Sequence, residues 1–262
     1  MSLRCEITGP ESAPHLVLLP PLGGSGELFE PFRRDLSRDH RVVTCEVDAS
    51  VGILTTRELA ADAAATLRQL GFERVDLFGI SFGGMIAQWL AIDHAPLLRR
   101  LVLASTCSHR PGLGDLLSLE GARLLGAVVL PGDADKRLVH EIVSDDRLAD
   151  PGERERIDQA VGRHPHSREE LLRLLAAAAG HDTRDRLAEI RCPTLVLTAT
   201  RDEIVSPDLQ EELATSICGA LPAYVEDSGH DLTLDQPKET ARLVREFLES
   251  PARPSLRLPK YG

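Results

Sequence analysis

The stretch VDLFGISFGGMIAQ, residues 75–88, joins an apolar run, a glycine-flanked serine and the start of a helical pattern. Its residues 79–83 read G-I-S-F-G, which matches the pattern G-x-S-x-G between a strand and a helix. In so sharp a turn a β-carbon on either glycine would collide with neighbouring backbone. The pattern therefore predicts a strained Ser81 whose hydroxyl stands clear of the sheet, at the positive end of the helix that begins near Gly83. A five-residue match can also be a chance turn. The assignment of Ser81 as a nucleophile therefore depends on whether the rest of the chain provides a histidine and an acid beside it.

Strand-type apolar runs alternate with helical patterns on both sides of this stretch, which predicts an α/β fold with a mostly parallel, doubly wound sheet. The expected strands are residues 15–20, 41–48, 74–80, 100–106, 194–200 and 223–227, with residues 3–8 as an edge strand. Their nearly continuous apolar character is typical of strands covered on both faces. Apolar residues recur at helical spacing over residues 56–71 and 237–250, so helices are expected there.

The alternation of strands and helices stops between residues 108 and 190, where only helical patterns occur. Ser167 and Glu170 have the spacing of a capping box, and the helix that they begin should end at Gly180. Residues 116–130 are very apolar and belong either to ordinary packing or to a substrate-lining surface. We predict an α/β core of residues 1–107 and 191–250, a helical cap of residues 108–190 and a C-terminal tail of residues 251–262.

Composition excludes several classes of protein. The 262 residues carry a net charge of -11, which repels phosphate backbones and argues against a nucleic-acid partner. Apolar runs are much shorter than the roughly 20 residues that span a bilayer, and the first ten residues lack the apolar centre of a signal peptide. We therefore expect a cytoplasmic protein that acts on a small molecule and has no membrane partner. A homodimer is compatible with these observations.

The five cysteines are odd in number and have no C-x-x-C spacing, so neither a disulfide framework nor a zinc site is expected. They are interpreted as reduced structural thiols: Cys5, Cys45, Cys107, Cys192 and Cys218. The chain also lacks a phosphate-binding glycine loop and a cluster of metal ligands, so no cofactor is implied.

Serine is a poor nucleophile unless a base removes its proton, so the chemistry of Ser81 requires a histidine and an acid. Asp202 follows the expected strand 194–200, and His230 lies in the loop after strand 223–227. Parallel strands end at one edge of the sheet, so all three side chains should meet there. Other acids near these positions are alternatives to Asp202, namely Glu203, Asp208, Asp227 and Asp231.

Taken in order, these motifs resemble the α/β-hydrolase-fold serine hydrolases that carry a helical cap, a group of esterases and lactonases. The similarity runs from LVLLPPLGGSGELFEPF (16–32) through GISFGG (79–84) and RDEIVSP (201–207) to DSGHDLTLDQP (227–237). By that resemblance Ser81 is the nucleophile, His230 is the general base and later the acid, and Asp202 orients the imidazole.

The same resemblance implies an oxyanion hole made by the backbone amides of Phe82 and Leu22. In the family the loop before the second donor usually carries a His-Gly pair, whereas this chain has Pro20 and Pro21 there. Proline has no N–H, but Leu22 keeps its amide, so the hole is still expected to form. The departure leaves two alternatives, a rigid variant of a hydrolase or a site diverged towards elimination, cyclisation or another non-hydrolytic step. A lyase or C–C bond hydrolase of a biosynthetic or catabolic pathway is a separate alternative.

The substrate pocket is expected between this edge of the sheet and the helical cap. Its predicted lining residues are Leu22, Phe29, Phe82 and Trp89, with His109 and Arg110 near a polar or anionic group of the substrate. Only 3% of residues are aromatic, which favours an apolar pocket for a small or medium ester, thioester or lactone. A ligand-binding, receptor-like homologue that keeps its triad is the remaining alternative.

Overall fold

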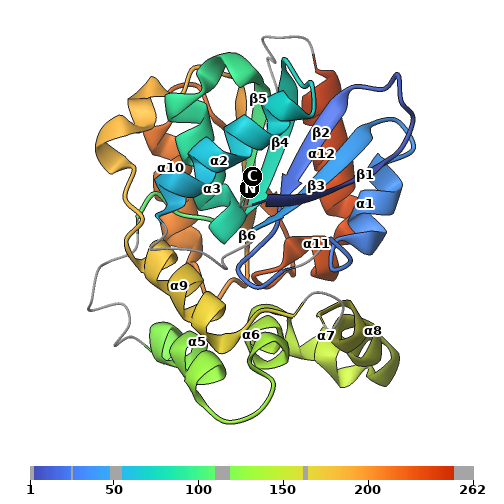
Figure 1. Cartoon of the computed structure of the whole chain (residues 1–262), viewed down its shortest axis with the longest axis vertical. Helices are drawn as coiled ribbons and strands as arrows, with labels where there is room; N and C mark the ends of the chain where they lie inside the picture. Colours follow the sequence, from blue (N-terminus) through green and yellow to red (C-terminus); the bar gives the residue numbers. More distant parts are fainter. Residues whose placement is uncertain (1–2, 25, 48–54, 110–118, 162–164, 251–262) are drawn as a thin grey trace, which may run out of the picture.

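A seven-stranded sheet forms the centre of the computed structural model (Figure 1), which describes residues 3–24, 26–47, 55–109, 119–161 and 165–250. The strands are β1 (Leu3–Thr8), β2 (His15–Leu19), β3 (Arg41–Val47), β4 (Val75–Ile80), β5 (Leu98–Ala104), β6 (Thr194–Ala199) and β7 (Leu221–Val225). Their order across the sheet is β1-β3-β2-β4-β5-β6-β7, and only β1 runs antiparallel to its neighbour. All the expected strands are present, so the prediction of a mostly parallel α/β sheet is confirmed.

Helices cover both faces of the sheet, because successive residues of each strand point to opposite sides. In β2, Val17 and Leu19 belong to one buried core, and Leu16 and Leu18 belong to the other. The first core is closed by α2 (Thr56–Gln69), α3 (Phe82–Asp93) and α10 (Pro207–Ser216), together with the short η1 (Ala95–Leu97) and η2 (Arg184–Glu189). The second is closed by α1 (Glu30–Leu36), α11 (Leu232–Asp235) and α12 (Pro237–Glu249). This two-sided burial explains why the strands are almost purely apolar.

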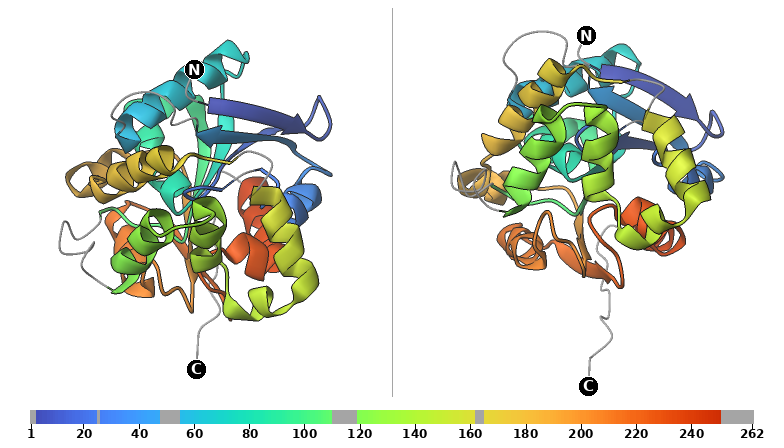
Figure 2. Two further views of the ribbon diagram at one scale, coloured as in Figure 1. Left: turned by 60° about the horizontal axis from the view of Figure 1, so that its bottom comes forward. Right: turned by 90° about the horizontal axis from the view of Figure 1, so that it is seen from below.

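The described residues between β5 and η2 form five α-helices, at the edge of the sheet where the parallel strands end (Figures 1 and 2). They are α5 (Leu119–Val129), α6 (Ala134–Ile142), α7 (Asp145–Ala149), α8 (Pro151–Val161) and α9 (Arg168–Ala179), and we call residues 119–179 the helical insert. Ser167 and Glu170 form the predicted capping box at the start of α9. The division into core and cap stays a prediction, and the predicted tail, residues 251–262, lies outside the described residues.

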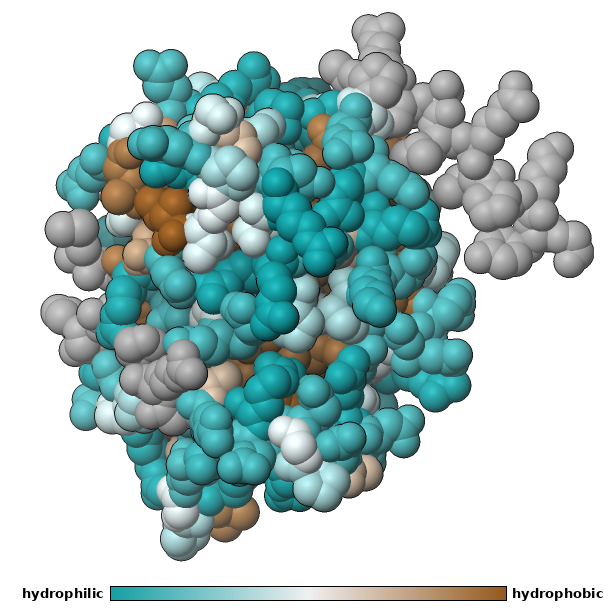
Figure 3. Space-filling model, turned by 90° about the vertical axis from the view of Figure 1, so that its right-hand side faces the viewer, coloured by the Kyte–Doolittle hydropathy of each residue, from teal (hydrophilic) through white to brown (hydrophobic). Residues whose placement is uncertain are grey.

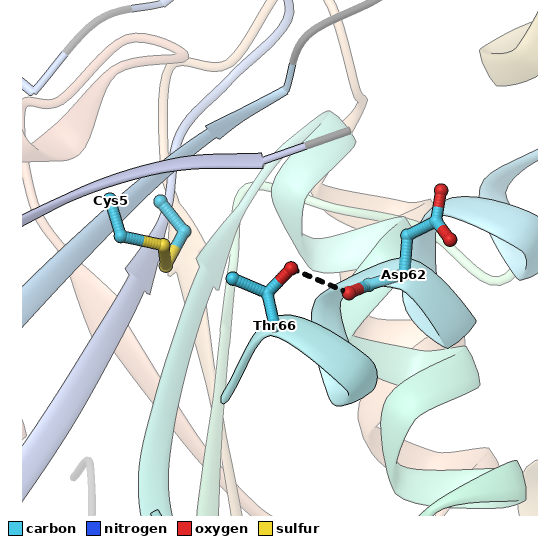
Figure 4. The surroundings of a disulfide bond; sticks show 4 residues. Cys5, Asp62 and Thr66 are labelled. Atoms are coloured by element: carbon cyan, nitrogen blue, oxygen red, sulfur yellow. Dashed lines mark hydrogen bonds between the residues drawn. A yellow bond between two sulfur atoms is a disulfide. The ribbon is translucent and has the colours of Figure 1, made fainter. Parts of the chain in front are cut away.

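Two of the five cysteines are not the free thiols that were expected from the sequence. Cys5 and Cys45 form a disulfide between β1 and β3 (Figure 4), so the interpretation of all five as reduced thiols was wrong for this pair. The antiparallel register places the two residues directly opposite each other, with their Cα atoms 4.3 Å apart. Their separation of 40 residues along the chain carries no such information, because strand register is a property of the folded sheet. Cys107, Cys192 and Cys218 are free.

The surface on the side of β1, α1 and α12 is covered mainly by hydrophilic side chains, with apolar ones in small separate groups (Figure 3). Among the residues that the structure describes, no helix combines the length and the apolar character needed to cross a bilayer.

Candidate active site

Ser81 occupies the sharp turn between β4 and α3. Its φ of +53° lies in a region that residues other than glycine rarely adopt, so the backbone is strained there. Two hydrogen bonds from β5 and its continuation hold the turn: Ser81 N–H donates to the Ala104 carbonyl at 2.9 Å, and Thr106 Oγ1 donates to the Ser81 carbonyl at 2.8 Å. The serine is therefore held at the carboxyl edge of the sheet by its neighbouring strand.

The two glycines of the motif are required by the close approach of backbone segments. A β-carbon on Gly83 would lie 2.1 Å from the Leu19 carbonyl oxygen, and one on Gly79 would lie 2.5 Å from the Gly83 carbonyl oxygen. Both distances are far below van der Waals contact, as the sequence predicted. The turn thus packs directly against the end of β2, which brings the loop after β2 to Ser81.

His230 joins Ser81 and Asp202 in one continuous chain of hydrogen bonds. Its Nε2 lies 2.7 Å from Ser81 Oγ, and its Nδ1 lies 2.9 Å from each carboxylate oxygen of Asp202. The side chains of His230 and Asp202 are only 2% and 0% exposed, so water competes little for these contacts. The structure brings together the three residues that the sequence proposed, from the loops after β4, β6 and β7.

The Asp202 carboxylate is held by more than its contact with His230. Its Oδ1 accepts the backbone N–H groups of Ile204 and Val205, both at 2.9 Å. Its Oδ2 accepts a 2.9 Å hydrogen bond from the side-chain amide of Gln210, which is fully buried on α10. These three donors fix the orientation of the carboxylate. The sequence analysis missed Gln210, because no motif distinguishes it from other polar residues of a helix.

In the described part of the chain, none of the other candidate acids hydrogen-bonds to His230: Glu203, Asp208, Asp227 and Asp231. The nearest along the chain is Asp231, whose Oδ1 caps α11 by accepting the backbone N–H groups of Thr233 and Leu234. Complete burial raises the pKa of Asp231 above its ordinary value. Asp227 instead pairs with Arg201 at the surface. Asp202 is therefore the acid that hydrogen-bonds to His230 within the described residues.

The loop with the two prolines forms a tight turn. Gly24 N–H donates to the Pro21 carbonyl at 2.9 Å, and Gly23 has a φ of +71°, as the third position of a type II turn requires. Leu22 lies in the middle of this turn, and Leu22 and Phe82 both line the pocket at Ser81. Phe82 is the first residue of α3, so its amide has no acceptor within the helix. Both predicted donors are at the site, and the turn holds the loop without the usual histidine.

An apolar pocket of about 40 Å³ lies over Ser81 and His230. The rest of its lining is Leu22, Phe82, Met85, Leu124, Leu138, Ile142, Leu175, Ala178, Ile204 and Val205. The helical insert supplies half of these ten side chains, from α5, α6 and α9. In α5, Leu124 both packs in the core and lines this pocket, whereas a substrate-lining role stays a prediction.

Two predicted lining residues lie elsewhere. Phe29 belongs to the core on the other face of the sheet, where its ring meets Phe78 edge to face at 6.4 Å. Trp89 is on α3, but its ring lies beneath the guanidinium groups of Arg57 and Arg186, 4.9 and 5.6 Å from the ring centroid. The assignment of both to the pocket is corrected, since distance along the chain from a motif does not reveal which way a side chain points.

His109 and Arg110 were expected near a polar group of the substrate. His109 is not among the pocket residues; its Nδ1 lies 3.1 Å from Ser108 Oγ, and its backbone pairs with Asp182. Arg110 lies outside the described residues.

A larger, open groove of about 440 Å³ adjoins the pocket, and the two share His230, Ile142 and Ile204. Charged residues dominate its walls, and its three arginines already have acidic partners: Arg123 with Glu141, Arg147 with Glu153, and Arg201 with Asp227. The site is therefore apolar on the Ser81 side of the imidazole and polar on the other.

No group of three or more His, Cys, Asp or Glu side chains in the described ranges has the arrangement of a metal site.

Comparisons with known proteins agree with this geometry. The profile of the Alpha/beta hydrolase family matches residues 16–243. The "Putative carbamate hydrolase RutD" of Rhizobium rhizogenes is 27% identical over 90% of this chain and 92% of its own length. The 3-oxoadipate enol-lactonase 1 of Acinetobacter baylyi is 25% identical over 95% and 94%, respectively.

Among solved structures, the enol-lactonase from Burkholderia xenovorans superposes with a TM-score of 0.83 at 24% identity, over 95% of this chain and 96% of its own. At that identity the likeness concerns the fold. The family match and the names of the relatives agree with the prediction of an enzyme. The chain belongs to the alpha/beta hydrolase family.

Proposed function

We propose that this protein is a serine hydrolase that cleaves a small or medium apolar ester, thioester or lactone through an acyl-enzyme at Ser81. The observation that carries the proposal is the continuous hydrogen-bond chain from Ser81 Oγ through His230 to Asp202. A serine with a base in contact, and a base oriented by a buried acid, is the arrangement that nucleophilic catalysis requires.

In the first half of the reaction, Ser81 Oγ attacks the carbonyl carbon while its proton passes to His230 Nε2. The carbonyl oxygen becomes an oxyanion, which the amides of Leu22 and Phe82 stabilise. Asp202 stabilises the positive charge of the imidazolium. His230 then gives its proton to the leaving oxygen or sulfur, the acyl–oxygen or acyl–sulfur bond breaks, and the acyl group stays on Ser81.

In the second half, water attacks the acyl-enzyme and loses a proton to His230. The collapse of this second oxyanion breaks the bond to Ser81 Oγ, which regains the proton from His230. The carboxylic acid leaves, and the three side chains return to their starting state.

The shape of the site favours a small acyl group. Pockets for drug-sized ligands have roughly 300–1,000 Å³, whereas the apolar pocket at Ser81 has about 40 Å³. Because His230 must deliver a proton to the leaving group, that group should lie on the imidazole side, towards the polar groove. An enol-lactonase and a carbamate hydrolase among the relatives support cleavage at an acyl carbon. C–C bond cleavage is the second candidate, because a 2-hydroxy-6-oxononadienedioate hydrolase is 30% identical over 70% of this chain.

A small-molecule substrate is the part of the proposal that rests on composition. The cytoplasmic location expected from composition is not part of it, because the disulfide between Cys5 and Cys45 favours an oxidising compartment.

A series of p-nitrophenyl esters from acetate to decanoate, with simple γ- and δ-lactones, tests the function. We expect the highest kcat/KM for the short acyl chains and a loss of about 10⁶-fold in kcat for Ser81→Ala. A fluorophosphonate should label the unchanged chain at Ser81, as shown by peptide mass spectrometry. Ester turnover that persists in Ser81→Ala would refute the acyl-enzyme mechanism. Labelling without turnover of any ester or lactone would favour the lyase or receptor alternatives.

A further inference from the structure

The side chain of Asp235, at the end of α11, contacts two segments that are far apart in the chain. Its Oδ2 accepts the backbone N–H of Gly229, the residue before His230, at 2.7 Å. Its Oδ1 accepts the hydroxyl of Ser144, between α6 and α7, at 2.6 Å. One carboxylate therefore links the His230 loop to the helical insert.

Further hydrogen bonds connect the same two segments. The backbone N–H of Asp231, the residue after His230, donates to the Ile142 carbonyl at 3.2 Å. Arg147 Nη2 donates to the carbonyl of Asp235 at 3.1 Å. Residues on both sides of the imidazole are thus attached to residues 142–147, and Figure 2 shows α7 and α8 beside the C-terminal helices.

Gly229 shows how closely the segments fit. A β-carbon there would lie 3.1 Å from Asp235 Oδ2 and 3.6 Å from the Ser144 Cβ. The chain before His230 therefore passes between the Asp235 carboxylate and the insert, with little space for a side chain. Ile142, whose carbonyl accepts the Asp231 N–H, also lines the apolar pocket.

From these contacts we infer that Asp235 is a positioning residue, which couples the placement of the His230 imidazole to the position of the helical insert. This inference rests on the proposed function, because it assumes that His230 is the base for Ser81. Asp235 does not touch the reacting atoms. One carboxylate oxygen binds the loop at Gly229, and the other binds Ser144 of the helical insert. When the insert covers the substrate pocket, the same carboxylate therefore holds the His230 imidazole in place.

Three variants separate the two arms of this carboxylate. Asp235→Ala removes both contacts. Ser144→Ala removes only the contact with the insert. Asp235→Asn keeps a carbonyl oxygen for Gly229 and an amide that can donate to the Ser144 hydroxyl, so it should restore part of the loss. Glu239→Ala is the matched control, because Glu239 is an acid on the adjacent α12 whose side chain bonds only to Arg242 among the described residues.

The readouts are kcat and KM for p-nitrophenyl acetate and the rate constant of fluorophosphonate labelling at Ser81. Small misplacements of catalytic groups can cost about 100-fold in rate, so we expect a loss of about that size for Asp235→Ala. The loss should fall on kcat and on the labelling rate, with little change in KM. Ser144→Ala should lose several-fold, Asp235→Asn should lie between Asp235→Ala and the unchanged chain, and Glu239→Ala should match the unchanged chain.

A purely structural role would lower the thermal midpoint without changing the labelling rate of the folded fraction. That result, or unchanged kinetics in both Asp235→Ala and Ser144→Ala, would overturn the inference. If Asp235→Ala does not fold, Ser144→Ala decides alone, since it keeps the contact with Gly229. A chain that labels at Ser81 but turns over no ester would contradict the proposed function, and the labelling rates would still decide the role of Asp235.

Discussion

Gln210 donates its side-chain amide both to Asp202 Oδ2 at 2.9 Å and to the Val205 carbonyl at 2.7 Å. It also accepts the backbone N–H of Ala199, the last residue of β6, at 3.2 Å. Gln210 therefore ties the acid of the proposed triad to the end of the strand that carries it.

Replacing Gln210 by leucine should lower kcat/KM by about 10- to 100-fold, the equivalent of one buried hydrogen bond to a charged group. The reason is that Asp202 would lose a donor and the restraint on its orientation. Steady-state kinetics with a p-nitrophenyl ester measure the effect, with Gln69→Leu on the exposed end of α2 as the control. Wild-type kinetics in Gln210→Leu would show that the backbone donors at Ile204 and Val205 suffice.

The rate of acylation should fall as the pH is lowered into the acid range. Only neutral His230 can accept the Ser81 proton, so the logarithm of kcat/KM should decline with a slope of about one per pH unit. Initial rates between pH 5 and 9 measure this limb, after a check that the chain stays folded at each pH. A rate that does not change with pH over this range would rule out His230 as the base.

Replacing Gly83 by alanine should strongly destabilise the fold and abolish activity. The added β-carbon would lie 2.1 Å from the Leu19 carbonyl oxygen, so backbone has to move at the turn that carries Ser81. The matched control is Gly126→Ala on α5, where Leu130 is the one side chain of the described residues within 4 Å of the new β-carbon. That change should raise stability by about 0.5–1 kcal/mol, because alanine favours helix over glycine. Thermal unfolding distinguishes the two, and equal midpoints would contradict the prediction.

The stability of the chain should fall in acid partly because of His181. Burial lowers the pKa of this imidazole to about 3, and its Nδ1 lies 2.9 Å from Thr56 Oγ1. Between the ordinary pKa of 6.5 and this value, the unfolded chain binds a proton at His181 that the folded chain does not. The free energy of unfolding should therefore decrease as the pH falls, by up to about 1.4 kcal/mol per pH unit from this group.

Urea unfolding between pH 4 and 7 measures this dependence. His181→Gln removes the titrating group, so its free energy of unfolding should depend less steeply on pH than that of the unchanged chain. Parallel curves for the two proteins would show that His181 does not contribute.

Much of the fold could be predicted because its signals are local. Buried parallel strands read as continuous apolar runs, and β5 and β7 are displaced from their expected positions by only two residues. The strained turn at Ser81 could also be predicted, because the glycines on both sides of it avoid backbone collisions that a β-carbon would cause in so sharp a turn. The residues that support the site could not be predicted, because no local motif marks Gln210, Asp235 or Ser144. Only tertiary packing brings them to Asp202 and to the His230 loop.

The sequence by itself determined the order of strands and helices, the nucleophile turn, and the chain order of Ser81, Asp202 and His230, because these depend on the chemistry of short segments. Only the tertiary structure decided which acid faces the imidazole, that Phe29 and Trp89 point away from the pocket, and that Cys5 lies opposite Cys45. Those contacts join elements that are distant in the chain. Their register and orientation follow from packing the whole sheet and its helices together, which no single segment encodes.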